Sequence, residues 1–373
     1  MGYYGGDGME RMKRLGFLEV HELFLTTGGP LFVGDGRILD ARHWVRSGDV
    51  LQLLDPEIFG ARLLAQGLLA TWQAHQAAGG TAADFLEGHP DLGNISDLTV
   101  RSLPLHEGAP VDRLRTFLRR PDGCPYVPGS TVKGALRNVL MVYFLNEMPE
   151  TEREKWRNRL RQAFNAEAPT AFSGEMQALQ QTILHTLHLQ TRQVSSTLND
   201  LMRAISIADS DPLPPDATLA ATVRRVHQDG EERKAEAYEV LPPDLRVRLT
   251  LRIDIPLMNR AGLMLTLLNE ALQLAQLMQE RVFWEKIHTP RRAPVDLRDL
   301  YLYLGGGAGF VNKTLLYALF DQAEARDLTN ALLAQTPGYD PAFGGSVAPY
   351  TRPTVLFKGI SHDMGKCRIT IHY

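Results

Sequence analysis

The chain has 373 residues, with 40 Lys and Arg against 43 Asp and Glu, and 44% of its residues are hydrophobic. This composition is typical of a globular protein and excludes a disordered chain, a collagen-like repeat and a disulfide-rich scaffold. The net charge of −3 provides no overall basic field, so any contact with nucleic acid has to come from local basic patches.

The only cysteines, Cys124 and Cys367, form no C-x-x-C pair, which excludes a zinc finger and is typical of a reducing cytoplasm. Residues 1–8 lack the basic and apolar regions of a signal peptide, and we predict a flexible lead-in there. No apolar run approaches the ~20 residues that cross a bilayer. We therefore expect a cytoplasmic protein without membrane contact.

Strands and helices are predicted along the whole chain. In the first half we predict strands over 15–27, 98–105 and 203–208, helices over 49–78 and after Gly129, and an inserted helical region at about 150–200. In the second half we predict strands over 218–226, 246–255, 300–304, 354–357 and 366–373, and helices over 262–283 and 310–334. The mixture favours an α+β class with antiparallel sheets and helices on one face. The Pro- and Asp-rich residues 209–215 are the best linker candidate, so we predict domains at 1–210 and 211–373.

The segment 128–137, PGSTVKGALR, is the most informative stretch. Gly129 permits a tight entry to a helix capped by Ser130 or Thr131, and a helix N-terminus favours anions. Lys133 and Arg137 are four residues apart and share one helix face. Residues 111–137 hold six basic and two acidic residues, which indicates a patch for a phosphate backbone. The alternative is an ordinary capped helix with solvated basic side chains.

The segment 305–314, GGGAGFVNKT, lies between a predicted strand and a predicted helix. It is not a P-loop, because Lys313 is four residues beyond the last glycine, and Asn at position 312 excludes a dinucleotide fingerprint. Gly305, Gly306 and Gly307 would let a sugar–phosphate backbone approach closely. A plain flexible loop is the alternative.

A third segment, 358–366, carries Lys358, Gly359, Gly365 and Lys366 and is either a loop that bends around RNA phosphates or an ordinary hairpin turn. The histidines are scattered and form no hydrolase motif, so surface positions are expected for His185 and His188. Asp209 and Asp211 either bind a metal or belong to the linker.

Taken in order, VGDG at 33–36, the 128–137 and 305–314 segments and GISHDMG at 359–365 resemble the RAMP superfamily of CRISPR proteins. The PGSxxKGxxR element is shared across the superfamily, and GGGxGFxxKT resembles the family of fifth Csm subunits of type III-A effector complexes. The resemblance extends from Leu15 to Tyr373, although residues 150–200 carry no motif.

This resemblance implies two ferredoxin-like, RRM-like domains. It implies a subunit that caps the backbone filament at the 3′ end of the CRISPR RNA and supports maturation of that guide. The implied partners are the CRISPR RNA, target RNA, the repeated backbone subunit, the small subunit and host ribonucleases that trim the guide. No catalytic residue, cofactor or metal is expected. The RNA-binding candidates are Gly34, Gly36, Gly129, Ser130, Lys133, Arg137, Gly305, Gly306, Gly307, Lys313, Lys358, Gly359, Gly365 and Lys366.

Two rival functions stay open. One is the repeat-cleaving endoribonuclease of the same superfamily, for which His21 or His43 would be the candidate histidine. The other is a RAMP subunit of a type III-B complex, which would have different neighbours.

Overall fold

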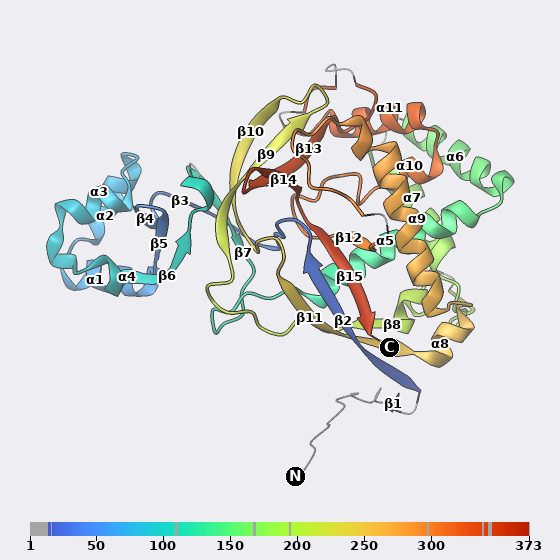
Figure 1. The fold of residues 1–373 in the computed structure, drawn as a ribbon, viewed down its shortest axis with the longest axis horizontal. Helices are drawn as coiled ribbons and strands as arrows, with labels where there is room; N and C mark the ends of the chain where they lie inside the picture. Colours follow the sequence, from blue (N-terminus) through green and yellow to red (C-terminus); the bar gives the residue numbers. More distant parts are fainter. Residues whose placement is uncertain are drawn as a thin grey trace, which may run out of the picture.

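A computed structural model describes residues 14–15, 17–108, 111–166, 169–193, 195–296, 298–337, 339–341 and 345–372 (Figure 1). The lead-in predicted for residues 1–8 lies outside these residues. Two six-stranded sheets form the centre of the molecule, and a small three-stranded sheet belongs to a lobe at one end.

Sheet one is antiparallel and brings the beginning and the end of the chain together. Its order is β12-β15-β2-β11-β8, and β1 pairs with β2 at the side. Figure 1 shows β2, β11 and β15 side by side. The bounds are β1 Arg14–Leu15, β2 Leu18–Thr27, β8 Ile205–Ile207, β11 Arg246–Asp254, β12 Tyr301–Tyr303 and β15 Lys366–His372. The period-two pattern predicted for β11 is confirmed, because Val247, Leu249, Leu251 and Ile253 are buried between exposed arginines.

Helices cover one face of sheet one and make the main core with it. Leu23 and Leu25 of β2 are fully buried in the same cluster as Leu136 of α5 and Leu272 of α9. Each such side chain contributes about 1.5–3 kcal/mol by leaving water. The helices on this side are α5 Gly129–Glu147, α6 Glu150–Asn165, α7 Pro169–Leu184, α8 Ile255–Arg260, α9 Leu265–Val282, α10 Leu316–Leu319 and α11 Gln322–Leu333.

Sheet two has the order β14-β13-β9-β10-β7-β3, with one parallel pair, β10 and β7. Its strands are β3 Gly34–Asp40, β7 Arg113–Phe117, β9 Leu219–His227, β10 Glu232–Val240, β13 Thr351–Phe357 and β14 Ile360–Asp363. The predicted α+β class with antiparallel sheets is therefore confirmed, apart from the one parallel pair. Both six-stranded sheets take strands from both sides of residue 210, so the predicted halves share their sheets. The division at 210 and the two ferredoxin-like domains stay predictions.

The small lobe projects from the end of sheet two (Figure 1). It is inserted between β3 and β7 and has its own core, which includes Phe59, Trp72 and Phe85. Its elements are β4 Trp44–Ser47, β5 Val50–Leu54, α1 Pro56–Ala65, α2 Leu69–Ala77, α3 Ala82–Gly88, α4 Ile95–Leu98 and β6 Thr99–Pro104.

Two long helix predictions and one cap prediction need correction. Residues 49–78 begin with a strand and then form two helices that part near Gly67, whose positive φ of 70° ends the first. Residues 310–334 also contain two helices, because Asp321 caps a new one. The predicted cap of α5 is wrong as well: Pro128 occupies that position, and neither Ser130 nor Thr131 does.

Candidate nucleic-acid interface

Three glycine-bearing segments that are far apart in the sequence meet in the structure. The amide of Gly306 donates to the carbonyl of Phe32 at 2.8 Å, and the amide of Gly365 donates to Pro30 O at 2.7 Å. Leu304 N donates in turn to Gly365 O at 2.8 Å. Residues 30–36, 305–314 and 359–365 therefore form one structural unit, called here the glycine unit.

The glycines of this unit first of all accommodate the chain itself. A Cβ at Gly305 would lie 2.0 Å from the Phe32 carbonyl oxygen, and one at Gly365 would lie 2.2 Å from Leu304 O. Both residues also have a positive φ, 73° and 74°. At Gly306 a Cβ would lie 2.8 Å from the Phe32 ring. The close approach expected at these positions exists, but the approaching group is protein; contact with RNA there stays a prediction.

Three other predicted glycines differ in their surroundings. A Cβ at Gly34 would meet the Phe32 ring at 2.7 Å, and Gly307, with a φ of 79°, faces Met364. Gly36 has a φ of 87°, and a Cβ there would meet nothing within 4 Å, so this glycine is required only for the bend of β3.

The N-terminus of α5 is already engaged by a carboxylate. Gly129 N donates to Asp209 Oδ1 at 2.9 Å, and a Cβ on Gly129 would lie 2.1 Å from the carbonyl oxygen of Ile207. The first amide expected to face a phosphate is therefore used within the protein, and Gly129 is buried. Asp211 lies 3.5 Å from Arg248, so protein groups engage both carboxylates, which argues against the metal alternative for Asp209 and Asp211.

A basic cluster lies on the exposed side of α5. Arg137 forms an ion pair with Asp200, which also accepts a hydrogen bond from Met202 N at 2.9 Å. Lys133 is half-buried beside them, and burial lowers its pKa, partly offset by the charge of Asp200. Arg203 is exposed and close enough for its charge to lower the pKa of Lys133 further, although the sequence pattern did not single it out. Lys133 is therefore close to two other cations, Arg137 and Arg203, and to one carboxylate, Asp200.

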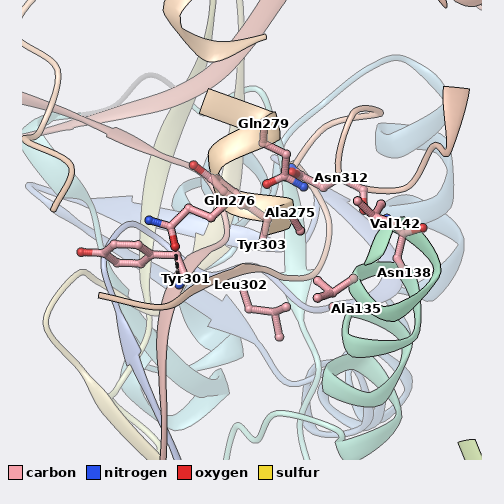
Figure 2. A pocket seen from close by; sticks show the side chains of 11 residues that line it. Ala135, Asn138, Val142, Ala275, Gln276, Gln279, Tyr301, Leu302, Tyr303 and Asn312 are labelled. Atoms are coloured by element: carbon pink, nitrogen blue, oxygen red, sulfur yellow. Dashed lines mark hydrogen bonds between the residues drawn. The ribbon is translucent and has the colours of Figure 1, made fainter. Parts of the chain in front are cut away.

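A hydrogen bond joins this cluster to the glycine unit. Asn138 Nδ2 donates to Asn312 O at 2.8 Å. Figure 2 shows both residues at a pocket between α5, α9 and β12. The bond therefore holds the 305–314 segment, which carries the exposed Lys313, against α5, the helix that carries Lys133 and Arg137.

The 358–366 segment separates into an exposed turn and a buried end. Lys358 and Gly359, with φ values of 48° and 76°, form the two-residue turn between β13 and β14, so the hairpin alternative is right for the backbone. The Lys358 side chain is exposed. Lys366, in contrast, is 5% exposed, and its Nζ lies 4.1 Å from the centre of the Tyr301 ring. Lys366 thus packs inside the protein, which corrects its prediction as a phosphate contact.

Comparison with known proteins places the chain in a family. The family model of the RAMP superfamily matches residues 24–312. The protein belongs to the RAMP superfamily. Its relatives include the CRISPR system Cms protein Csm5 of Mycobacterium tuberculosis, in strains CDC 1551 and H37Rv. Each is 22% identical over 398 residues, which cover 95% of this chain and 98% of the relative.

Two solved structures share the fold of this RAMP protein. One is a chain of a Csm–crRNA–target RNA ternary complex of a type III-A CRISPR-Cas system, with a TM-score of 0.65, 16% identity and coverage of 94% of this chain and 100% of the other. The second is Csm5 of T. onnurineus, with a TM-score of 0.60, 17% identity and coverage of 92% and 99%.

The basic patch predicted for residues 111–137 of the RAMP protein is not one surface. Arg119 is almost completely buried and pairs with Glu239, whose side chain is fully buried. Glu239 also binds Arg101 at 2.8 Å and accepts from Phe117 N at 3.0 Å. Arg119 therefore holds sheet two together, and Lys133 and Arg137 form a separate surface on α5.

The histidines fit no shared catalytic arrangement. His21 is 3% exposed, and His43 lies in a turn where Nδ1 is 2.9 Å from Asp40 Oδ1. The surface position expected for His185 is wrong, because this residue is 7% exposed and lies 3.9 Å from Asp200. Among the described residues, no group of three His, Cys, Asp or Glu side chains is arranged to hold a metal ion. Within the same part of the chain, every helix is too short or too polar to cross a membrane.

Proposed function

We propose that this RAMP protein is the Csm5-type subunit of a type III-A CRISPR complex. It binds the CRISPR RNA without cleaving it, caps the filament of backbone subunits at the 3′ end of that RNA and supports maturation of the guide in antiviral defence. The observation that carries the proposal is the hydrogen bond from Asn138 to Asn312, which holds the glycine unit against α5, the helix that carries the basic cluster. The relatives named Csm5 support it, since they align over nearly their whole length.

The chemistry of the α5 cluster suits a phosphate. Burial disfavours the charged form of Lys133, and a bound phosphate would favour that form by placing an anion beside the ammonium group. Arg137 is held in place by Asp200, so its guanidinium is oriented before RNA arrives. Arg203 and Lys313 are exposed and add positive charge to this surface. These side chains would contact phosphates and so bind unrelated guide sequences alike.

Further contacts of the proposed RNA path come from other exposed candidates. Ser130 on the first turn of α5 and Lys358 at the β13–β14 turn are both open to solvent, as is Gly36. Gly305, Gly306 and Gly307 are half-exposed and would present backbone to a ribose. The proposed partners are the 3′ region of the CRISPR RNA, target RNA, the repeated backbone subunit, the small subunit and the ribonucleases that trim the guide.

Salt-dependent binding of single-stranded CRISPR RNA tests this site. Changing Lys133 and Lys313 to Ala should weaken binding about equally for unrelated sequences. It should also flatten the slope of log affinity against log salt by about 0.7 for each lost phosphate contact. The control changes Lys155 and Lys286, which are exposed on α6 and after α9. An unchanged slope in the first variant would return both lysines to a role as solvated surface side chains.

Incubation with RNA tests the absence of cleavage. Purified protein should leave repeat and spacer RNA intact with and without divalent metal. Metal-independent cleavage that is lost in His43→Ala would instead identify the endoribonuclease of the superfamily. Copurification with type III-B subunits would identify the other rival.

A further inference from the structure

Sheet one has a second face, which the helices leave uncovered. Opposite residues of paired antiparallel strands lie on the same face, so the register defines a grid. Arg246 lies opposite Thr26, which lies opposite Arg368 and then Tyr301. The next row holds Arg248, Phe24 and Thr370, and the third holds Thr250, Glu22 and His372. A fourth row holds Ser206, Arg252 and Val20.

This open face is basic although the whole chain is acidic. Arg246, Arg248, Arg252 and Arg368 are all exposed, and Glu22 is the one carboxylate within these described rows of the grid. Arg248 pairs with Glu22 and lies 3.5 Å from Asp211, and Arg368 lies 3.7 Å from Asp299 at the rim. Neither Arg246 nor Arg252 pairs with a carboxylate in the described part of the chain. The face therefore retains a surplus of positive charge.

Aromatic rings lie among these arginines. The guanidinium carbon of Arg246 is 3.7 Å from the centre of the Phe24 ring, and the rings of Phe24 and His372 are 5.0 Å apart. Phe24 is a β-strand residue that its hydrophobicity alone would place in the core, yet it is half-exposed here. A partly exposed aromatic surface bordered by arginines is the combination that binds single-stranded nucleic acid, because bases stack on rings while cations follow the backbone.

We propose that the open face of sheet one, formed by β2, β11 and β15, is a second binding surface for single-stranded RNA. The stretch from Arg246 to Arg252 spans about 20 Å along β11, and the three strands cover about 10 Å across. Several nucleotides fit on such an area. Bases stack on the exposed His372 and, where a phosphate draws Arg246 away from its ring, on Phe24; phosphates meet Arg246 and Arg252. The surface is separate from the α5 site, because α5 packs against the buried face of the same sheet.

Crosslinking and affinity measurements on the full chain test this surface. Ultraviolet crosslinking to an unstructured oligouridine, followed by peptide mapping, should recover segments 18–27 and 366–372. Arg246→Ala with Arg252→Ala should flatten the salt slope by about 0.7 for each lost contact. Phe24→Leu retains an apolar side chain but removes the ring, and it should weaken binding by about fivefold to a hundredfold. The control changes Arg62 and Arg281, which are exposed on α1 and α9, to Ala.

The outcomes separate this surface from the α5 site. The Lys133 and Lys313 variant is measured in parallel, and its losses should add to those of the sheet variants. Wild-type affinity and salt slope in the sheet variants, with weakened binding in the α5 variant, would overturn this proposal alone. Wild-type RNA binding combined with loss of a neighbouring subunit from the assembled complex would also overturn it, since the face would then be a protein interface.

Discussion

Three glycine-to-alanine changes separate two physical reasons for glycine in this fold. Gly36 has a positive φ of 87° but open space around it. Gly129 needs no positive φ, but a Cβ there would lie 2.1 Å from Ile207 O. Gly305 combines a φ of 73° with an approach of 2.0 Å to Phe32 O. Since the obstructing atoms at Gly129 and Gly305 belong to backbone, no side-chain rotation relieves them.

The expected costs follow from these geometries. An L-residue in the left-handed region costs about 1–2 kcal/mol, which is the whole effect expected for Gly36→Ala. Forcing atoms into a packed site costs about 1–3 kcal/mol, the effect expected for Gly129→Ala. Gly305→Ala should lose both contributions, about 2–5 kcal/mol. It should also break the hydrogen bond from Gly306 N to Phe32 O and loosen the glycine unit.

These differences are measured by urea denaturation, monitored by far-ultraviolet circular dichroism. The three variants and the wild type are prepared in the same way. The expected order of stability loss is Gly305→Ala above Gly129→Ala and Gly36→Ala. RNA binding on the same samples shows whether Gly305→Ala also disturbs the proposed site. If Gly305→Ala were no less stable than Gly36→Ala, the close approach to Phe32 would add nothing to the loss of unfolding free energy, and the packing argument would be refuted.

Three further predictions concern buried charges and thiols. Glu239→Gln should lower the free energy of unfolding by about 3–5 kcal/mol, because it leaves the buried Arg119 and the half-buried Arg101 without their counter-charge; urea curves that match the wild type would contradict this. Burial alone would raise the pKa of Asp363, but the charges of Arg352 and Arg292 outweigh it, so the folded pKa lies below 3.8. The stability that ionised Asp363 provides is therefore present above the unfolded pKa of 3.8 and lost as the pH falls through the folded pKa. The loss of unfolding free energy caused by Asp363→Asn should accordingly become smaller in acid. A loss that is the same at every pH would refute this linkage. Burial raises the pKa of the Cys367 thiol to about 12, so a thiol reagent should modify Cys124 in the native protein and Cys367 only after denaturation.

Local hydrophobic periodicity was sufficient to predict strands and helices that have one buried face and one exposed face. The alternation of residues 246–255 predicted β11, because one face is buried under helices while the other meets solvent. The apolar spacing after Gly129 predicted α5 for the same reason. The small lobe was not predicted as a unit, since its short strands and helices become stable only through a shared core around Phe59 and Trp72.

Site residues were harder to interpret, because charge in a sequence carries no information about burial. Arg119 and Lys366 have the same side-chain chemistry as exposed cations, yet Glu239 and the Tyr301 ring hold them inside the protein. Arg203 and the arginines of β11 became part of a site only once pairing of distant strands and helices set their neighbours.

The sequence by itself determined the α+β class, the order of the glycine motifs and the resemblance to the RAMP superfamily, because these depend on local pattern and residue identity. Only the tertiary structure decided that the glycine motifs meet each other, that Asp209 occupies the start of α5 and that Phe24 lies among arginines on an open sheet. Such relations arise from contacts between residues that are far apart along the chain, and no local pattern encodes them.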